Sequence, residues 1–102
     1  MRVVVMFNLK AGVEPAAYEE WARTRDLPGI RSLPSVDDVT IYRTTGLLGA
    51  DGKPPYQYVE IIDVGDTDGY ATDSGGDAAQ TVAREFKQFA DAPFFMATEP
   101  LD

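Results

Sequence analysis

The sequence predicts a small α+β fold, and three observations lead to this prediction. Short segments rich in β-branched and aromatic residues alternate with segments whose apolar residues recur at helical spacing. Gly and Pro residues separate these segments. The chain has 102 residues, which fits one domain over residues 1–102 and leaves no room for two.

The first strand is predicted over residues 3–9, which read VVVMFNL. Alternation places Val3, Val5 and Phe7 on one face and Val4 and Met6 on the other. Because both faces are apolar, we expect a central strand that is covered on both sides.

The first helix is predicted to begin at Pro15 and to end near Asp26, because Pro28 disfavours helical geometry at Leu27. Its inner face would carry a stripe at helical spacing: Ala17, Tyr18, Trp21, Ala22 and Arg25. Three charged residues would face away: Glu19, Glu20 and Arg23. Ile30 and Leu33 would anchor the connection that follows.

Two strands, over residues 36–45 and 57–64, are predicted to form a hairpin with a long loop. Tyr58, Glu60 and Ile62 share one face of the later strand, and Tyr42 would join them if the register permits. The loop, residues 46–55, superficially resembles a phosphate-binding loop. Leu47 stands where that motif needs Gly, and Pro54 follows the Lys, so we expect no nucleotide site.

The last third of the chain predicts a short helical turn at residues 66–72 and then a longer helix. Asp77 would cap this helix, which would run to about residue 91 and present Val82, Phe86 and Phe89. Pro93 would stop it, and residues 94–98 would form a fourth strand. The order β-α-β-β-α-β is that of a ferredoxin-like fold, a four-stranded antiparallel sheet with helices on one face.

An apolar face of that sheet would lie opposite the helices. One of the two apolar sets of the first strand must lie there, alongside Val39 and Ile41 or Val59 and Ile61 of the hairpin. Such a face would be an unusually large exposed patch. We therefore expect a homodimer that pairs through the sheet faces. The alternative is a monomer with a partly hydrophobic surface.

Composition excludes several classes of function. The net charge is −8 and Lys and Arg do not cluster, which argues against nucleic acid or an anionic membrane as partner. The absence of Cys and His removes thiolate catalysis, Cys/His zinc sites and His-based triads, so we expect neither a metal site nor a cofactor. No membrane-length apolar run and no signal peptide is visible, and a cytoplasmic location is expected.

Glu60 is the main catalytic candidate. A carboxyl group in the middle of a strand with apolar neighbours would have a raised pKa, which suits acid–base chemistry near neutral pH. Tyr58 on the same face could orient a carbonyl or hydroxyl group. The alternatives are a Glu on a solvated sheet face or a Glu paired with Arg43.

Several other side chains could bind a small planar ligand between the helices and the sheet. Aromatic rings that could stack on it, or simply pack in the core, are Tyr18, Trp21, Phe86 and Phe89. Tyr42 could donate a hydrogen bond. Arg25 could bind a ligand oxygen, although an Arg there more commonly extends to solvent or interacts with the helix C-terminus.

Several motifs resemble the RedY-like, or HapK-type, proteins of bacterial pathways to prodigiosin-type pigments. They are W-A-R-T-x-D-L-P, L-P-S-V, Y-V-E and F-A-D-A-P, within residues 18–43, 56–63 and 82–94. The resemblance implies a dimeric α/β barrel that acts on an aromatic pyrrole- or indole-type intermediate at a condensation or cyclisation step. Four residues match recurring family positions: Trp21, Asp26, Tyr58 and Glu60.

Three hypotheses for function remain. The first is a small acid–base enzyme of secondary metabolism that uses Glu60. The second is a non-catalytic carrier that shields a reactive heterocyclic intermediate from water. The third is a cofactor-free monooxygenase. The wider superfamily that the RedY-like family resembles also contains enzymes of this class. The pocket His that several cyclases of the superfamily use is absent, so their mechanism does not transfer.

Overall fold

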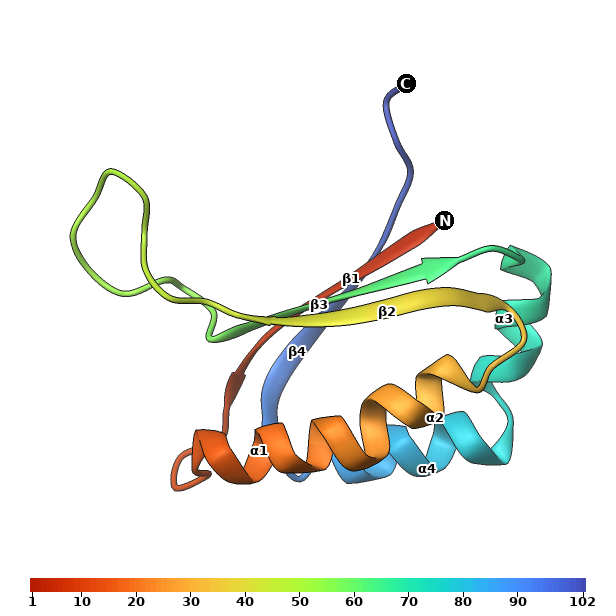
Figure 1. Cartoon of the computed structure of the whole chain (residues 1–102), viewed down its shortest axis with the longest axis horizontal. Coiled ribbons are helices and arrows are strands. Elements are labelled where there is room, and N and C mark those ends of the chain that lie inside the picture. The colour runs from red at the N-terminus through yellow and green to blue at the C-terminus, as the bar shows by residue number, and fades with distance from the viewer.

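The computed structural model describes residues 1–102 and contains one four-stranded antiparallel sheet in the order β2-β3-β1-β4. The strands are β1 (Arg2–Leu9), β2 (Val36–Arg43), β3 (Tyr58–Val64) and β4 (Ala90–Thr98). The helices are α1 (Pro15–Trp21), α2 (Leu27–Arg31), α3 (Thr67–Ser74) and α4 (Asp77–Phe86). Figure 1 shows α1, α2 and α4 together on one side of the sheet. The predicted ferredoxin-like α+β fold is confirmed.

The core lies between the central strand β1 and the helices. Val5 and Phe7 of β1 are completely buried, as is Tyr18 of α1. The Phe7 ring meets three other rings, with centroid distances of 5.4 Å to Tyr18, 5.5 Å to Tyr58 and 4.9 Å to Phe86. Each such apolar side chain contributes about 1.5–3 kcal/mol when it is fully buried.

The position of Pro28 predicted that the first helical segment would end near Asp26, and this prediction is wrong. The segment continues through a wide π-helical turn, η1 (Ala22–Asp26), into α2, and the backbone N–H of Leu27 donates to the oxygen of Ala22. Pro28 then lies in the first turn of α2, where its missing N–H costs no helical hydrogen bond. None of the helices is long and apolar enough to cross a membrane.

The second long helix ends earlier than predicted, at Phe86, and β4 begins at Ala90. Pro93 therefore lies inside a strand instead of stopping a helix. A strand accepts Pro at an edge or a bulge, and β4 provides both: it is an edge strand, and its pairing with β1 shifts between Met6 and Asn8. Ala92, beside the Pro, has a φ of 43° at this bulge.

The register of the hairpin decides which residues share a face. Ile41 pairs with Glu60 and Tyr42 pairs with Val59. Tyr42 therefore lies on the sheet face opposite the helices, away from Glu60, so the expectation that it joins the Tyr58–Glu60 face is wrong.

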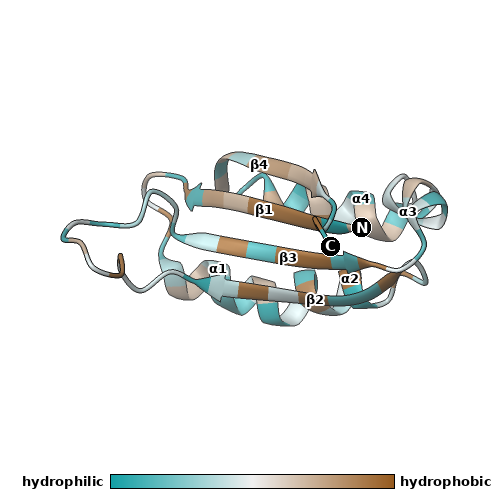
Figure 2. Ribbon diagram, turned by 90° about the horizontal axis from the view of Figure 1, so that it is seen from above, coloured by the Kyte–Doolittle hydropathy of each residue, from teal (hydrophilic) through white to brown (hydrophobic).

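The sheet face opposite the helices is apolar along its centre, and Figure 2 looks onto it. Val4 pairs with Ile61 and Met96, and Met6 pairs with Val59 and Phe94. We refer to these six residues as the open face. Phe94 is 54% exposed and Met96 is 39% exposed, so this face is uncovered in the single chain.

Candidate functional site

A cavity of about 230 Å³ lies between the sheet and helices α2, α3 and α4, and we refer to it as the carboxylate cavity. Its walls are mostly apolar and include Ile30, Val82 and Phe86. Two of its lining residues, Asp26 and Glu60, are carboxylic acids. An apolar cavity with a few convergent polar groups is typical of small-molecule sites.

Glu60 projects from the middle of β3 into this cavity. The residue is only 5% exposed, and its Oε2 atom has no hydrogen-bond partner. It is therefore not on a solvated sheet face. It is not paired with Arg43 either, because the Arg43 guanidinium binds Glu19. Burial raises the pKa of Glu60 well above its ordinary value, and the nearby Asp26 carboxyl raises it further.

Asp26 is the partner of Glu60, and it is only 3% exposed. Burial raises its pKa to about 6, while a hydrogen bond with Glu60 acts in the opposite direction. The same hydrogen bond raises the pKa of Glu60. Both directions are those expected when a protonated Glu60 donates to an ionised Asp26, because two adjacent buried carboxylates cannot both ionise cheaply.

The π-helical turn brings Asp26 to the cavity. A regular helix was expected to place Arg25 on the inner stripe with Tyr18 and Ala22. The turn in η1 accommodates an extra residue, so the next inward position falls on Asp26, which is buried, while Arg25 is exposed. Turns of this type occur frequently at functional sites.

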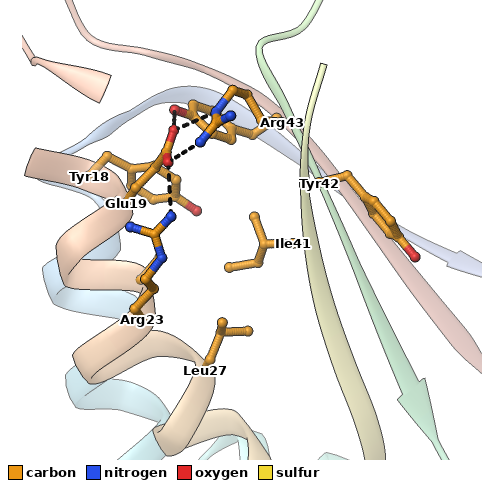
Figure 3. Close-up of a pocket in the computed structure, with 9 residues that line it drawn as sticks. Tyr18, Glu19, Arg23, Leu27, Ile41, Tyr42 and Arg43 are labelled. Carbon is orange, nitrogen blue, oxygen red and sulfur yellow. Dashed lines mark hydrogen bonds and ion pairs between the residues drawn. The ribbon is translucent and has the colours of Figure 1, made fainter. Parts of the chain in front are cut away.

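A second hollow, of about 320 Å³, lies between α1, η1 and β2, and we refer to it as the arginine groove. Figure 3 shows Glu19 there, facing Arg23 and Arg43, with Leu27 and Ile41 along the floor. Arg43 Nε donates to Glu19 Oε2 over 2.8 Å. The Nη2 atom of Arg23 lies 3.3 Å from Glu19 Oε1. Contrary to the prediction, Glu19 does not face away from the sheet. The hydrogen bond from Arg43 is the main reason that the pKa of Glu19 falls to about 2.

Tyr58 belongs to this groove and does not line the carboxylate cavity. Its hydroxyl donates to Glu19 Oε2 over 2.8 Å. Burial, followed by that hydrogen bond, raises the pKa of Tyr58 to about 12. Tyr18 also borders the groove, and its buried hydroxyl has no hydrogen-bond partner. The ring of Tyr42 points away from the groove, on the far side of β2 (Figure 3).

Of the other predicted ligand-binding residues, only Phe86 lines the carboxylate cavity, and Trp21, Phe89 and Arg25 lie outside it. Phe86 lines it, and Trp21 stacks on Phe86 with a centroid distance of 6.1 Å. Phe89 packs against Trp21 at 5.1 Å without lining the cavity. Arg25 does not point inward, because its guanidinium binds both carboxylate oxygens of Glu85.

Five lining residues of the carboxylate cavity were not predicted from the sequence: Tyr70 and Ser74 of α3, Ala79 and Ala83 of α4, and Phe95 of β4. The helix α3 has almost no amphipathic pattern, and residues 66–72 were expected to form only a short helical turn. One signal was available, because Asp66 caps α3 and accepts from the backbone N–H of Gly69. Nowhere in residues 1–102 do three or more His, Cys, Asp or Glu side chains gather as a metal site.

The fold and the carboxylate cavity define a class of protein, the ferredoxin-like α+β domains with a pocket between sheet and helices. Within that class, the family model described as "REDY-like protein HapK" matches residues 1–101. The chain belongs to this family. No curated protein matches the chain.

Three solved structures illustrate how widely this fold occurs. HapK from Hahella chejuensis is 22% identical with a TM-score of 0.73, over 97% of this chain and 93% of that one. A dimeric ferredoxin-like protein from Thermobifida fusca is 14% identical with a TM-score of 0.70, over 93% and 85%. SnoaB, a cofactor-independent oxygenase from Streptomyces nogalater, is 16% identical with a TM-score of 0.70, over 98% and 94%.

Proposed function

We propose that this chain is a small acid–base enzyme of bacterial secondary metabolism that condenses or cyclises an aromatic pyrrole- or indole-type intermediate, as in the formation of prodigiosin-type pigments. The observation that carries the proposal is the buried Asp26–Glu60 pair in an apolar cavity. The pKa of Asp26 is raised to about 6 and burial also raises the pKa of Glu60, which suits the pair to act as acid and base. Membership of the RedY-like family supports the substrate class.

A condensation between an aldehyde and a pyrrole needs such a pair. The protonated carboxyl gives its proton to the carbonyl oxygen as the new carbon–carbon bond forms. The resulting carboxylate then takes the proton from the pyrrole carbon that formed the new bond, which restores the aromatic ring. The same proton then protonates the hydroxyl group, which leaves as water, and loss of a pyrrole N–H proton gives the neutral conjugated product. The rings of Phe86 and Phe95 lie at the cavity wall, where a planar substrate would pack.

Glu60→Gln tests the proposal, because an amide keeps the shape of the carboxyl group but cannot transfer the proton. The assay combines a bipyrrole carbaldehyde with an alkylpyrrole and follows the visible absorbance of the conjugated product. We expect turnover to fall by at least about 100-fold, the usual size of an acid–base contribution, while the affinity for the aldehyde stays nearly unchanged. Unchanged turnover would exclude Glu60 as the acid–base group.

Two other functions remain in view, and the same assay separates them. A carrier would bind the aldehyde saturably without raising the rate above that of the uncatalysed reaction. A cofactor-free monooxygenase, which the shared fold with SnoaB favours, would consume oxygen with an electron-rich phenol and would be inactive without oxygen. Full activity under anaerobic conditions would exclude oxygenation.

The open face supports pairing of two copies. It presents a row of apolar side chains on adjacent strands, and exposed apolar patches of this kind mark interaction sites. The Thermobifida fusca relative with the same fold is described as dimeric. We therefore assign a homodimer through the sheet faces to the proposed function.

A further inference from the structure

The carboxylate cavity holds negative charge with no positive charge to balance it. Among its twelve lining residues, the titratable groups are Asp26 of η1, Glu60 of β3 and Tyr70 of α3, and none is a Lys or Arg. The nearby cations are engaged elsewhere: Arg25 binds Glu85, and Arg31 donates to the oxygen of Val39. Burial of a carboxylate without a counter-ion costs free energy of folding. The site therefore lacks a cation, which a ligand could supply.

The unpartnered Oε2 atom of Glu60 shows where that missing element would bind. The atom is buried and can accept a hydrogen bond, yet nothing in the chain donates one. If Glu60 directs its proton to Asp26, Oε2 remains a pure acceptor on a residue that lines the cavity. A ligand that fills this position must therefore bring an N–H or O–H donor.

We propose that the carboxylate cavity binds a protonated nitrogen heterocycle, which directs an N–H group at Glu60 Oε2 and supplies the cation that the Asp26–Glu60 pair lacks. This inference rests on the proposed function, since it names the ligand class of the same cavity. A volume of about 230 Å³ is smaller than the usual range for drug-sized ligands, so the cavity holds one or two rings, such as the reacting end of a longer substrate. Ligands that carry a carboxylate are excluded by repulsion.

Three compounds of nearly equal shape test this preference by calorimetric titration at pH 7. They are 2-aminobenzimidazole, which is largely protonated, 2-aminobenzothiazole, which is neutral but has N–H donors, and benzothiazole, which has no donor. We expect the first to bind at least tenfold more tightly than benzothiazole, with the second between them. Equal affinities, or binding of none of the three, would overturn the proposal.

The matched variants are the double substitution Asp26→Asn with Glu60→Gln and the surface control Glu20→Gln. The double variant keeps the cavity volume but removes its charge, so the preference should shrink to about twofold or less. The control should keep the full preference, because Glu20 is exposed on α1. A double variant that still prefers the cation would contradict the proposal.

Should the double variant fail to fold, carboxyl ¹³C resonances of the unmodified protein give the same answer. Saturation with 2-aminobenzimidazole must shift the Glu60 and Asp26 signals, and unshifted signals would overturn the inference. The proposed function is judged separately, by turnover of Glu60→Gln. That single variant keeps the Asp26 charge and an acceptor oxygen, so it should lose turnover while it retains the preference for the cation.

Discussion

At the scale of single residues, Glu60 combines a cost in stability with a use in chemistry. Its carboxyl group is buried without a cation, and its raised pKa means that folding disfavours the ionised form that the unfolded chain adopts at pH 7, a cost that the neutral amide of Gln does not carry. We expect Glu60→Gln to raise the free energy of unfolding at pH 7 by about 1–3 kcal/mol. Urea denaturation would measure this, with Glu20→Gln as the control. A loss of stability would mean that Glu60 is bound more favourably than the structure indicates.

The two sets of carboxyl groups give opposite pH dependences. Asp26 and Glu60 have raised pKa values in the folded state, so the folded chain binds more protons than the unfolded one above their ordinary values, about 3.8 and 4.5. Stability therefore falls as pH rises from about 4 through 6 and above. Glu19, with a pKa lowered from 4.5 to about 2, contributes stability above 4.5 that is lost as pH falls.

The pH prediction is checked by the free energy of unfolding of the unmodified chain and of the double variant between pH 4 and pH 8. The advantage of the double variant should be small at pH 4 and should grow as pH rises. A constant difference between the two chains across this range would contradict the raised pKa values.

Tyr58 and its neighbour Glu19 give a contrasting prediction for the arginine groove. Tyr58→Phe removes only the hydroxyl that donates to Glu19, so we expect a loss of about 0.5–1.5 kcal/mol in stability. Turnover should stay within a few-fold of normal, because Tyr58 does not line the carboxylate cavity. A loss of turnover as large as that of Glu60→Gln would place Tyr58 among the catalytic residues.

At the scale of elements, the tip of the β2–β3 connection lines neither the carboxylate cavity nor the arginine groove. Residues 46–53 are all exposed, and Figure 1 shows the loop extending beyond the sheet. Replacement of residues 47–53 by Gly-Ser should change stability by less than about 0.5 kcal/mol, because shortening a flexible loop costs little. Turnover should be unaltered. A marked loss of turnover would show that the loop contributes to the site.

The helical elements show why proline positions were misjudged from sequence. Pro28 and Pro93 were expected to end helices, and each instead occupies a place where its missing N–H is harmless. Pro28 is tolerated because the π-helical turn restarts the helix, and Pro93 because β4 is a bulged edge strand. The sequence shows where a proline lacks the N–H that a helix or strand would use. The conformation of the neighbouring backbone decides whether that N–H is needed.

At the scale of the whole molecule, the open face predicts the oligomeric state. Phe94→Asp places a charge within the proposed dimer contact, and Phe94 is already exposed in the single chain, so folding should be retained. Light scattering after size exclusion should show a dimer for the unmodified chain and a monomer for this variant. Leu48→Asp, on the exposed loop, should remain dimeric. A dimer that survives Phe94→Asp would place the contact elsewhere.

The sequence by itself determined the order of the main elements and the two apolar faces of the sheet, and it singled out Glu60 while leaving the burial of its side chain open. These depend on short-range periodicity, which one strand or helix carries alone. Only the tertiary structure decided that Asp26, and not Arg25, meets Glu60, that Tyr42 faces away and that Glu19 binds Arg43 and Tyr58. Those contacts depend on strand register, which hydrogen bonds between distant segments set. They depend also on one wide helical turn, closed by the bond from Leu27 to Ala22, which the apolar periodicity of the sequence does not reveal.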